Sequence, residues 1–135
     1  MNQLKGIITE IKSCEGLSLI KVKTTNNVVF SSMMLTEAKA VDWLAEGKRV
    51  NLLFKEIEVM ISKDADLSIS VQNRIPCVVG SVKTGEILAQ VELLFNETSI
   101  SSIVTANACR QLDLKVNDGV TALVKTNEIS LSPDD

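Results

Sequence analysis

The hexapeptide VNLLFK at residues 50–55 returns as VTALVK at residues 120–125, and this repetition decides the fold. Two other stretches repeat at nearly the same distance: residues 2–8 (NQLKGII) match residues 73–79 (NRIPCVV), and residues 30–34 (FSSMM) match residues 100–104 (ISSIV). An offset of about 70 residues is too long for a solenoid repeat and is typical of tandem domains. The sequence therefore predicts two copies of one small domain, at residues 1–63 and 67–135, with the polar run at residues 62–66 between them.

Each copy has the pattern of a small β-rich domain. Strands are expected at residues 6–12, 19–24 and 28–34 in the first copy, and at residues 77–83, 87–94 and 99–104 in the second. A short helix should follow the third strand. In the first copy it would place Leu35, Ala38, Val41 and Leu44 on one face, and in the second Thr105 or Asn107 would cap it. The pattern predicts an all-β chain with short helices, folded as two tandem small β-barrels similar in outline to oligonucleotide-binding folds.

The last strand of each copy changes its inward face beside a lysine. Apolar residues at positions 120, 122 and 124 share one parity, whereas Ile129 and Leu131 share the other. The first copy changes parity at residues 55–56, which would turn residues 57, 59 and 61 inward. A bulge would explain each change and would leave backbone N–H groups beside Lys125 and Lys55, an arrangement that suits an anion. The alternative is that Lys125 only lies on a solvated face.

Composition and charge exclude several classes of function. The chain has 135 residues, a net charge of −3, one Trp, three Phe and no Tyr, so its core must be aliphatic. Without a basic block or aromatic platforms, no nucleic acid is expected as a partner. No apolar run is long enough to cross a membrane, and cytoplasmic residence is the default. With no His, and with Cys77 and Cys109 in core-like apolar patterns and Cys14 far from both, we expect neither an enzyme nor a disulfide framework nor a metal bound by direct ligands.

The second copy resembles a known family. Residues 67–75 (LSISVQNRI) are similar to the Ser-Ala-Arg-Asn opening of the Mop (molbindin) domain. The likeness continues through residues 78–86, 103–105 and 112–118 and ends at residues 120–125, so it covers nearly all of the second copy. The first copy follows more loosely from Asn2 onward. The chain as a whole therefore resembles a two-domain, di-Mop protein.

This resemblance implies a ligand, an assembly and a set of binding residues. Mop domains assemble as homo-oligomers with threefold symmetry and bind molybdate or tungstate at interfaces between domains, through hydrogen bonds. The positions implied for the oxyanion in the second copy are Ser70, Gln72, Asn73, Thr105, Lys125 and Thr126. Gln72 stands where the family usually has Arg, which implies weaker binding, an altered anion preference or the loss of binding.

The first copy offers only Lys55 and Asn2 as weaker candidates. Leu35 stands where the family has Thr, and Glu56 follows Lys55, so that a carboxylate would repel a dianion there. Two functions remain open. One is reversible oxyanion storage or homeostasis, and the other is a degenerate Mop scaffold that acts as a protein-interaction module without bound oxyanion.

Overall fold

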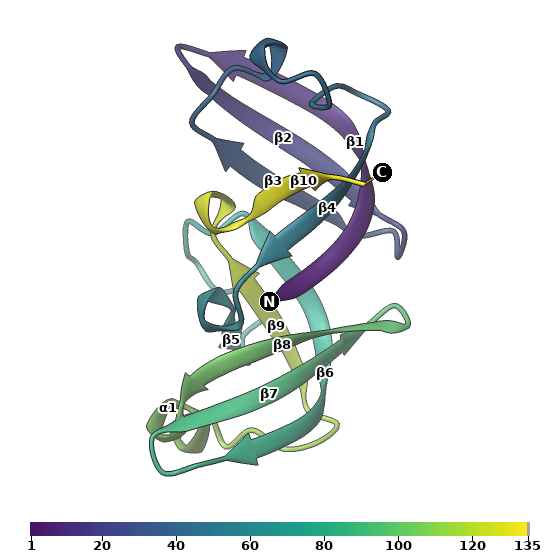
Figure 1. The fold of residues 1–135 in the computed structure, drawn as a ribbon. Helices are drawn as coiled ribbons and strands as arrows, with labels where there is room; N and C mark the ends of the chain where they lie inside the picture. Colours follow the sequence, from purple (N-terminus) through teal and green to yellow (C-terminus); the bar gives the residue numbers. More distant parts are fainter. Residues whose placement is uncertain (135) are drawn as a thin grey trace. The chain divides into compact units, whose positions relative to one another are not determined.

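The computed structural model describes residues 1–134, which form two compact units, each with one five-stranded antiparallel sheet (Figure 1). Of the described residues, the first unit holds 1–54 and 125–134, and the second holds 55–124. Strands dominate both units, and the only α-helix of the described residues has seven residues. The expected all-β class with short helices is confirmed.

The sheet of the first unit has the strand order β10-β4-β1-β2-β3. Its elements are β1 (Asn2–Cys14), β2 (Leu17–Thr24), β3 (Val29–Met34), the 3-10 helix η1 (Ala38–Ala40), β4 (Arg49–Phe54) and β10 (Ser130–Pro133). Alternate residues of β1, β2 and β4 are buried, as expected for strands with one face on a core. The rings of Phe30 and Phe54 lie at the centre of this core, with centroids 6.0 Å apart.

The sheet of the second unit repeats this arrangement with the order β5-β9-β6-β7-β8. Its elements are the 3-10 helix η2 (Glu56–Glu58), β5 (Met60–Ser62), β6 (Asn73–Thr84), β7 (Leu88–Phe95), β8 (Thr98–Thr105), α1 (Ala106–Leu112) and β9 (Gly119–Val124). Its core is mostly aliphatic, with Phe95 also buried in it, and Ile75, Val79, Val91, Leu93 and Val124 are all at most 1% exposed.

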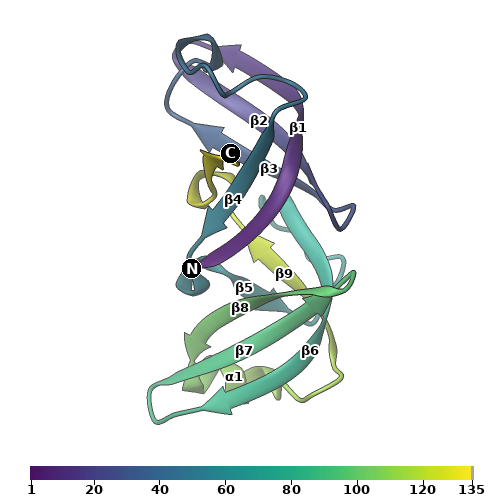
Figure 2. The ribbon, with the colours of Figure 1, turned by 45° about the vertical axis from the view of Figure 1, so that its right-hand side comes forward.

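The first strand of each copy bends so that it can pair with different strands at its two ends. In β1 residues 2–7 pair with β4 and residues 6–14 pair with β2, with a register shift between Ile8 and Glu10. The same shift lies between Val79 and Ser81 of β6. A bulge of this kind bends a strand and increases its twist, and both strands curve visibly along their length (Figure 2). Each sheet thereby curls toward a half-barrel.

The two copies exchange their last strands, which the linear boundaries at residues 1–63 and 67–135 do not anticipate. Strand β10 pairs with β4, so that Leu131 lies opposite Leu52 in the first unit, and β5 pairs with β9, so that Ile61 lies opposite Ala122 in the second. The predicted change of inward face is present, because Val59 and Ile129 are 1% and 2% exposed. The alternation of apolar residues shows which face of a strand is buried. It does not show which sheet the strand joins.

The helix expected from Leu35 to Leu44 is wrong. Only the 3-10 turn η1 forms there, and Leu35 is 86% exposed instead of facing the core. The turn is held by Ser18, whose Oγ donates to the carbonyl of Thr36 (2.7 Å) and accepts from the N–H of Ala38 (3.0 Å). Leu35 has no side-chain acceptor with which to cap a helix.

The corresponding helix of the second copy forms as predicted. The Oγ of Thr105 accepts from the N–H of Ala108 at 3.0 Å and so caps α1, which ends at Asp113 in the left-handed conformation. Ala106 and Cys109 face the core. Thr105 and Leu35 occupy the same position in the two copies, and only the copy with a cap residue at this position forms an α-helix among the described residues.

Candidate functional site

Lys55 and Lys125 stand at equivalent points, each directly before a 3-10 turn. The second turn, η3 (Thr126–Glu128), copies η2: the φ and ψ of Lys125 are −68° and 146°, and those of Lys55 are −75° and 147°. The carbonyl of each lysine accepts a hydrogen bond at 3.0 Å, from the N–H of Glu128 and of Glu58 respectively. The feature beside each lysine is therefore a tight turn and not the expected bulge. It leads the chain out of one sheet and toward the other.

The residues that follow the two lysines make the turns chemically different. Lys125 is exposed and is followed by the half-buried Thr126, whose hydroxyl can donate to an anion. Lys55 is also exposed, but the carboxylate of Glu56 follows it. Ile57, which was expected to face the core, is 64% exposed because it lies in the middle of the 3-10 turn. Only the Lys125 turn combines a cation with a neutral donor.

The opening segment of each copy meets the strand that precedes a lysine. Asn73 is 3% exposed and lies opposite Val124, the residue before Lys125. In the first copy Asn2 is 8% exposed and lies opposite Phe54, the residue before Lys55. The register therefore brings the two predicted asparagines to the last paired position before each lysine turn.

Arg74 holds the segment that carries Ser70 and Gln72. Its Nε donates to the carbonyl of Val71 at 3.0 Å, and its two terminal nitrogens donate to the carbonyls of Leu67 and Ile69. Ser70 is exposed between two of these carbonyls, and Gln72 is exposed between Val71 and the start of β6. The guanidinium thus acts as an internal clamp and does not replace the arginine that the family has at Gln72. Sequence reasoning missed this role, because nothing in the pattern shows which carbonyls the side chain reaches.

Thr105 lies at the opposite end of the strands of the second sheet from Asn73. It is paired with Leu88, the residue next to Ala89, and Ala89 is paired with Thr84 at the far end of β6 from Asn73. The strand between Asn73 and Thr84 spans roughly 35 Å at about 3.3 Å per residue. Because the Oγ of Thr105 accepts from Ala108, its hydroxyl hydrogen can still be donated. The structure therefore brings Asn73 to the Lys125 turn but does not bring Thr105 to Asn73 within one chain.

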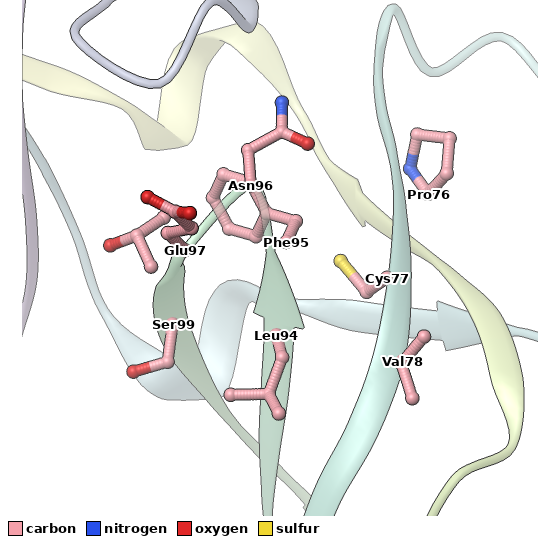
Figure 3. A pocket seen from close by; sticks show the side chains of 9 residues that line it. Pro76, Cys77, Val78, Leu94, Phe95, Asn96, Glu97 and Ser99 are labelled. Carbon is pink, nitrogen blue, oxygen red and sulfur yellow. The ribbon is translucent and has the colours of Figure 1, made fainter.

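A cleft of the second unit is lined by none of these residues. It has a volume of about 840 Å³ and is lined by Pro76, Cys77, Val78, Leu94, Phe95, Asn96, Glu97, Thr98 and Ser99 (Figure 3). Its walls are mostly apolar, its only ionisable groups are a carboxyl and a thiol, and it has no cationic side chain. The cleft offers a dianion no positive charge, whereas the Lys125 turn offers an ammonium, so the donor set around Lys125 is the better candidate.

Cys77, on the wall of this cleft, is predicted to be chemically inert. Burial raises the pKa of its thiol from 9.0 to about 11. Iodoacetamide at pH 8 should therefore modify the exposed Cys14 and leave Cys77 unlabelled, as measured by peptide mass spectrometry.

Because the folded-state pKa of Cys77 is raised, the stability that the neutral thiol contributes is present below pH 9 and is lost between pH 9 and 11. Cys77→Ala should remove that part of the alkaline destabilisation; early labelling of Cys77 would contradict the burial argument.

No helix among the described residues is long and apolar enough to cross a membrane. Among the same residues, no group of three or more His, Cys, Asp or Glu side chains could hold a metal ion. The residues predicted for the candidate site carry hydroxyl, amide and ammonium groups.

The chain is a duplicated β-protein with two copies of one curled five-stranded sheet, and the fourth strand of each copy ends directly before a lysine turn. Residues 69–131 match the family model of the TOBE domain. The chain is 27% identical over 135 residues to the molybdenum transport protein ModE of Azotobacter vinelandii, covering 97% of this chain and 49% of ModE. The chain therefore spans about half the length of that curated relative.

A solved structure matches almost the whole chain. The crystal structure of the cytoplasmic molybdate-binding protein ModG, with molybdate bound, is similar with a TM-score of 0.91 and 26% sequence identity. The match covers 98% of this chain and 96% of ModG. The chain thus has the tandem-domain fold of ModG, and the resemblance to a di-Mop protein is confirmed.

Proposed function

We propose that this protein binds molybdate, and also tungstate, reversibly and without catalysis, as a cytoplasmic store of the oxyanion. The likeness to ModG over nearly the full length of both chains carries this proposal. The turn at Lys125, with Thr126 after it and Asn73 opposite the preceding residue, supplies donors in the second copy.

The chemistry of the donors suits a tetrahedral dianion. Such an anion has only acceptor oxygens, and the proposed residues supply hydroxyl groups (Ser70, Thr105, Thr126), amide N–H groups (Gln72, Asn73) and one ammonium (Lys125). Hydrogen bonds to charged groups contribute about 1.5–3 kcal/mol each. Several of them acting together are sufficient for a dissociation constant on the order of micromolar after the costs of binding.

We further infer that the complete site is built between chains of a homo-oligomer with threefold symmetry. One chain leaves Thr105 at the far end of the sheet from Asn73, so Thr105 can join the other donors only if it comes from a second copy. The surface beside Thr105 is apolar: Ile87 is 77% exposed and its neighbour Leu88, which is paired with Thr105, is 50% exposed. An exposed apolar surface next to a hydroxyl donor is typical of a subunit contact.

Isothermal titration with molybdate, tungstate and sulfate tests the binding proposal, at a protein concentration of about 100 micromolar to detect weak affinities. Saturable binding of molybdate and tungstate is expected, with a trimer mass by light scattering. Elemental analysis of the freshly purified oligomer for Mo and W gives an independent measurement. Titrations without heat for both anions, together with the absence of Mo and W, would exclude storage and leave the interaction-module function.

Gln72→Arg should strengthen molybdate binding. Gln72 is exposed beside Ser70, and arginine would add a positive charge and a bidentate donor at the position where the Mop family has one. One added charge-assisted hydrogen bond corresponds to a gain of about tenfold in affinity. Gln72→Lys is the matched control, since it adds the charge without the planar fork. An unchanged affinity in both variants would place Gln72 outside the site.

A further inference from the structure

After each lysine turn, a backbone carbonyl accepts a hydrogen bond from a buried serine, and we call this hydrogen bond the clasp. The serine belongs to the sheet that the exchanged strand joins. Ser32, on β3, is fully buried, and its Oγ donates to the carbonyl of Ile129 at 2.6 Å. Ile129 is the residue that follows η3, and its own N–H donates to the carbonyl of Thr126. Ser32 thus holds the end of the turn that begins at Lys125.

The second unit contains the same clasp on the other turn. Ser102, on β8, is fully buried, and its Oγ donates to the carbonyl of Val59 at 2.6 Å. The N–H of Val59 in turn donates to the carbonyl of Glu56 at 3.2 Å. The Ser-Ser pairs at residues 31–32 and 101–102, which repeat in the sequence, therefore place a serine with the same function in each unit.

We propose that Ser32 is a positioning residue for the oxyanion site of the second copy, although it lies in the first copy of the sequence. The proposal rests on the proposed function. The Lys125 turn is held within the first unit: the N–H of Glu128 donates to the carbonyl of Lys125, and the carbonyl of Ile129, the residue after the turn, accepts from Ser32. A turn whose end is fixed to its own sheet has less conformational entropy left to lose when Lys125 and Thr126 bind an anion.

Removing the clasp should make the turn more mobile without removing any side chain that contacts the anion. Ser32→Ala leaves the buried carbonyl of Ile129 without its donor, which releases the end of η3. Ordering the turn then becomes part of the cost of binding. We expect the affinity for molybdate to fall about fivefold, the equivalent of one modest hydrogen bond.

Ser102→Ala is the matched control, because it removes a bond of the same type, length and burial from the Lys55 turn. Both variants should lower the melting temperature by similar amounts, but only Ser32→Ala should weaken molybdate binding in titration calorimetry. If Ser32→Ala does not fold, Asn51→Ala provides a milder release of the same strand, since the Nδ2 of Asn51 donates to Ser132 Oγ and to the carbonyl of Pro133, both at 3.3 Å. Equal affinities in all variants, or equal losses in both serine variants, would overturn the proposal.

Hydrogen exchange separates this inference from the proposed function. The amide of Glu128, bonded to Lys125, should exchange faster in Ser32→Ala only, and that of Glu58, bonded to Lys55, faster in Ser102→Ala only. If the unaltered protein does not bind molybdate while exchange follows this pattern, the oxyanion function fails but the clasp stands. If molybdate binds and Ser32→Ala leaves the Glu128 amide unchanged, the clasp fails and the function stands.

Discussion

Lys125→Met should weaken molybdate binding by at least about tenfold, because it removes the one ammonium of the proposed donor set and keeps the length of the side chain. Lys125 is exposed at the start of its turn, so the loss of stability should be small and the effect should lie in binding. Titration calorimetry with molybdate, backed by Mo content after purification, measures the change.

The repeated chain supplies two controls for this experiment. Lys55→Met alters the equivalent turn, where Glu56 already opposes an anion, and should change the affinity by less than about twofold. Lys23→Met removes an exposed lysine from β2 of the first unit, outside the proposed donor set, and should have no effect. If Lys125→Met binds molybdate as the unaltered protein does, or if Lys55→Met causes the larger loss, the site has been assigned to the wrong turn.

Ile129→Ala should destabilise the first unit, although Ile129 belongs to the second copy of the sequence. Its side chain is 2% exposed and lies next to the exchanged strand β10, within the unit that contains β1 to β4. Truncating a buried isoleucine to alanine costs about 2–5 kcal/mol. The free energy of unfolding measured in denaturant should fall by that amount.

The unit in which Ile129→Ala loses stability distinguishes an exchange of strands from two domains that are consecutive in sequence. Hydrogen exchange of Ile129→Ala should show faster exchange in β1, β2 and β4, and Val59→Ala should show it in β6, β7 and β9. The two variants serve as each other's controls. Faster exchange in β6 and β9 after Ile129→Ala would mean that the last strands stay with their own copies.

The local patterns in the sequence predicted most of the strands and part of the candidate site. Alternation identified the first three strands of each copy, with ends that differ from those observed by a few residues. A cap for the helix of the second copy was also predicted, with Thr105 and Asn107 as the two candidates, and the structure shows that it is Thr105. The same spacing argument failed at Leu35, where no cap exists and Ser18, distant in sequence, holds the chain instead.

The roles of Arg74, Ser32 and Ser102 could not be predicted, since each depends on a carbonyl whose position the sequence does not reveal. Arg74 fixes a segment a few residues before it, but the path of that segment is irregular. Ser32 reaches a carbonyl 97 residues later in the chain. Contacts of this kind arise from the packing of a whole sheet and leave no periodic signal.

By itself the sequence determined that the chain is a duplicated β-rich domain, that each copy turns its inward face beside a lysine, and that only the second copy keeps a neutral donor after that lysine. These properties follow from the repeat and from the two-residue period of a strand, both of which are local. Only the tertiary structure decided that the turned strands are exchanged between the units and that Thr105 lies at the opposite end of its sheet from Asn73. Pairing partners depend on which edge a strand meets after the chain has turned, and many edges satisfy the same pattern of buried and exposed residues.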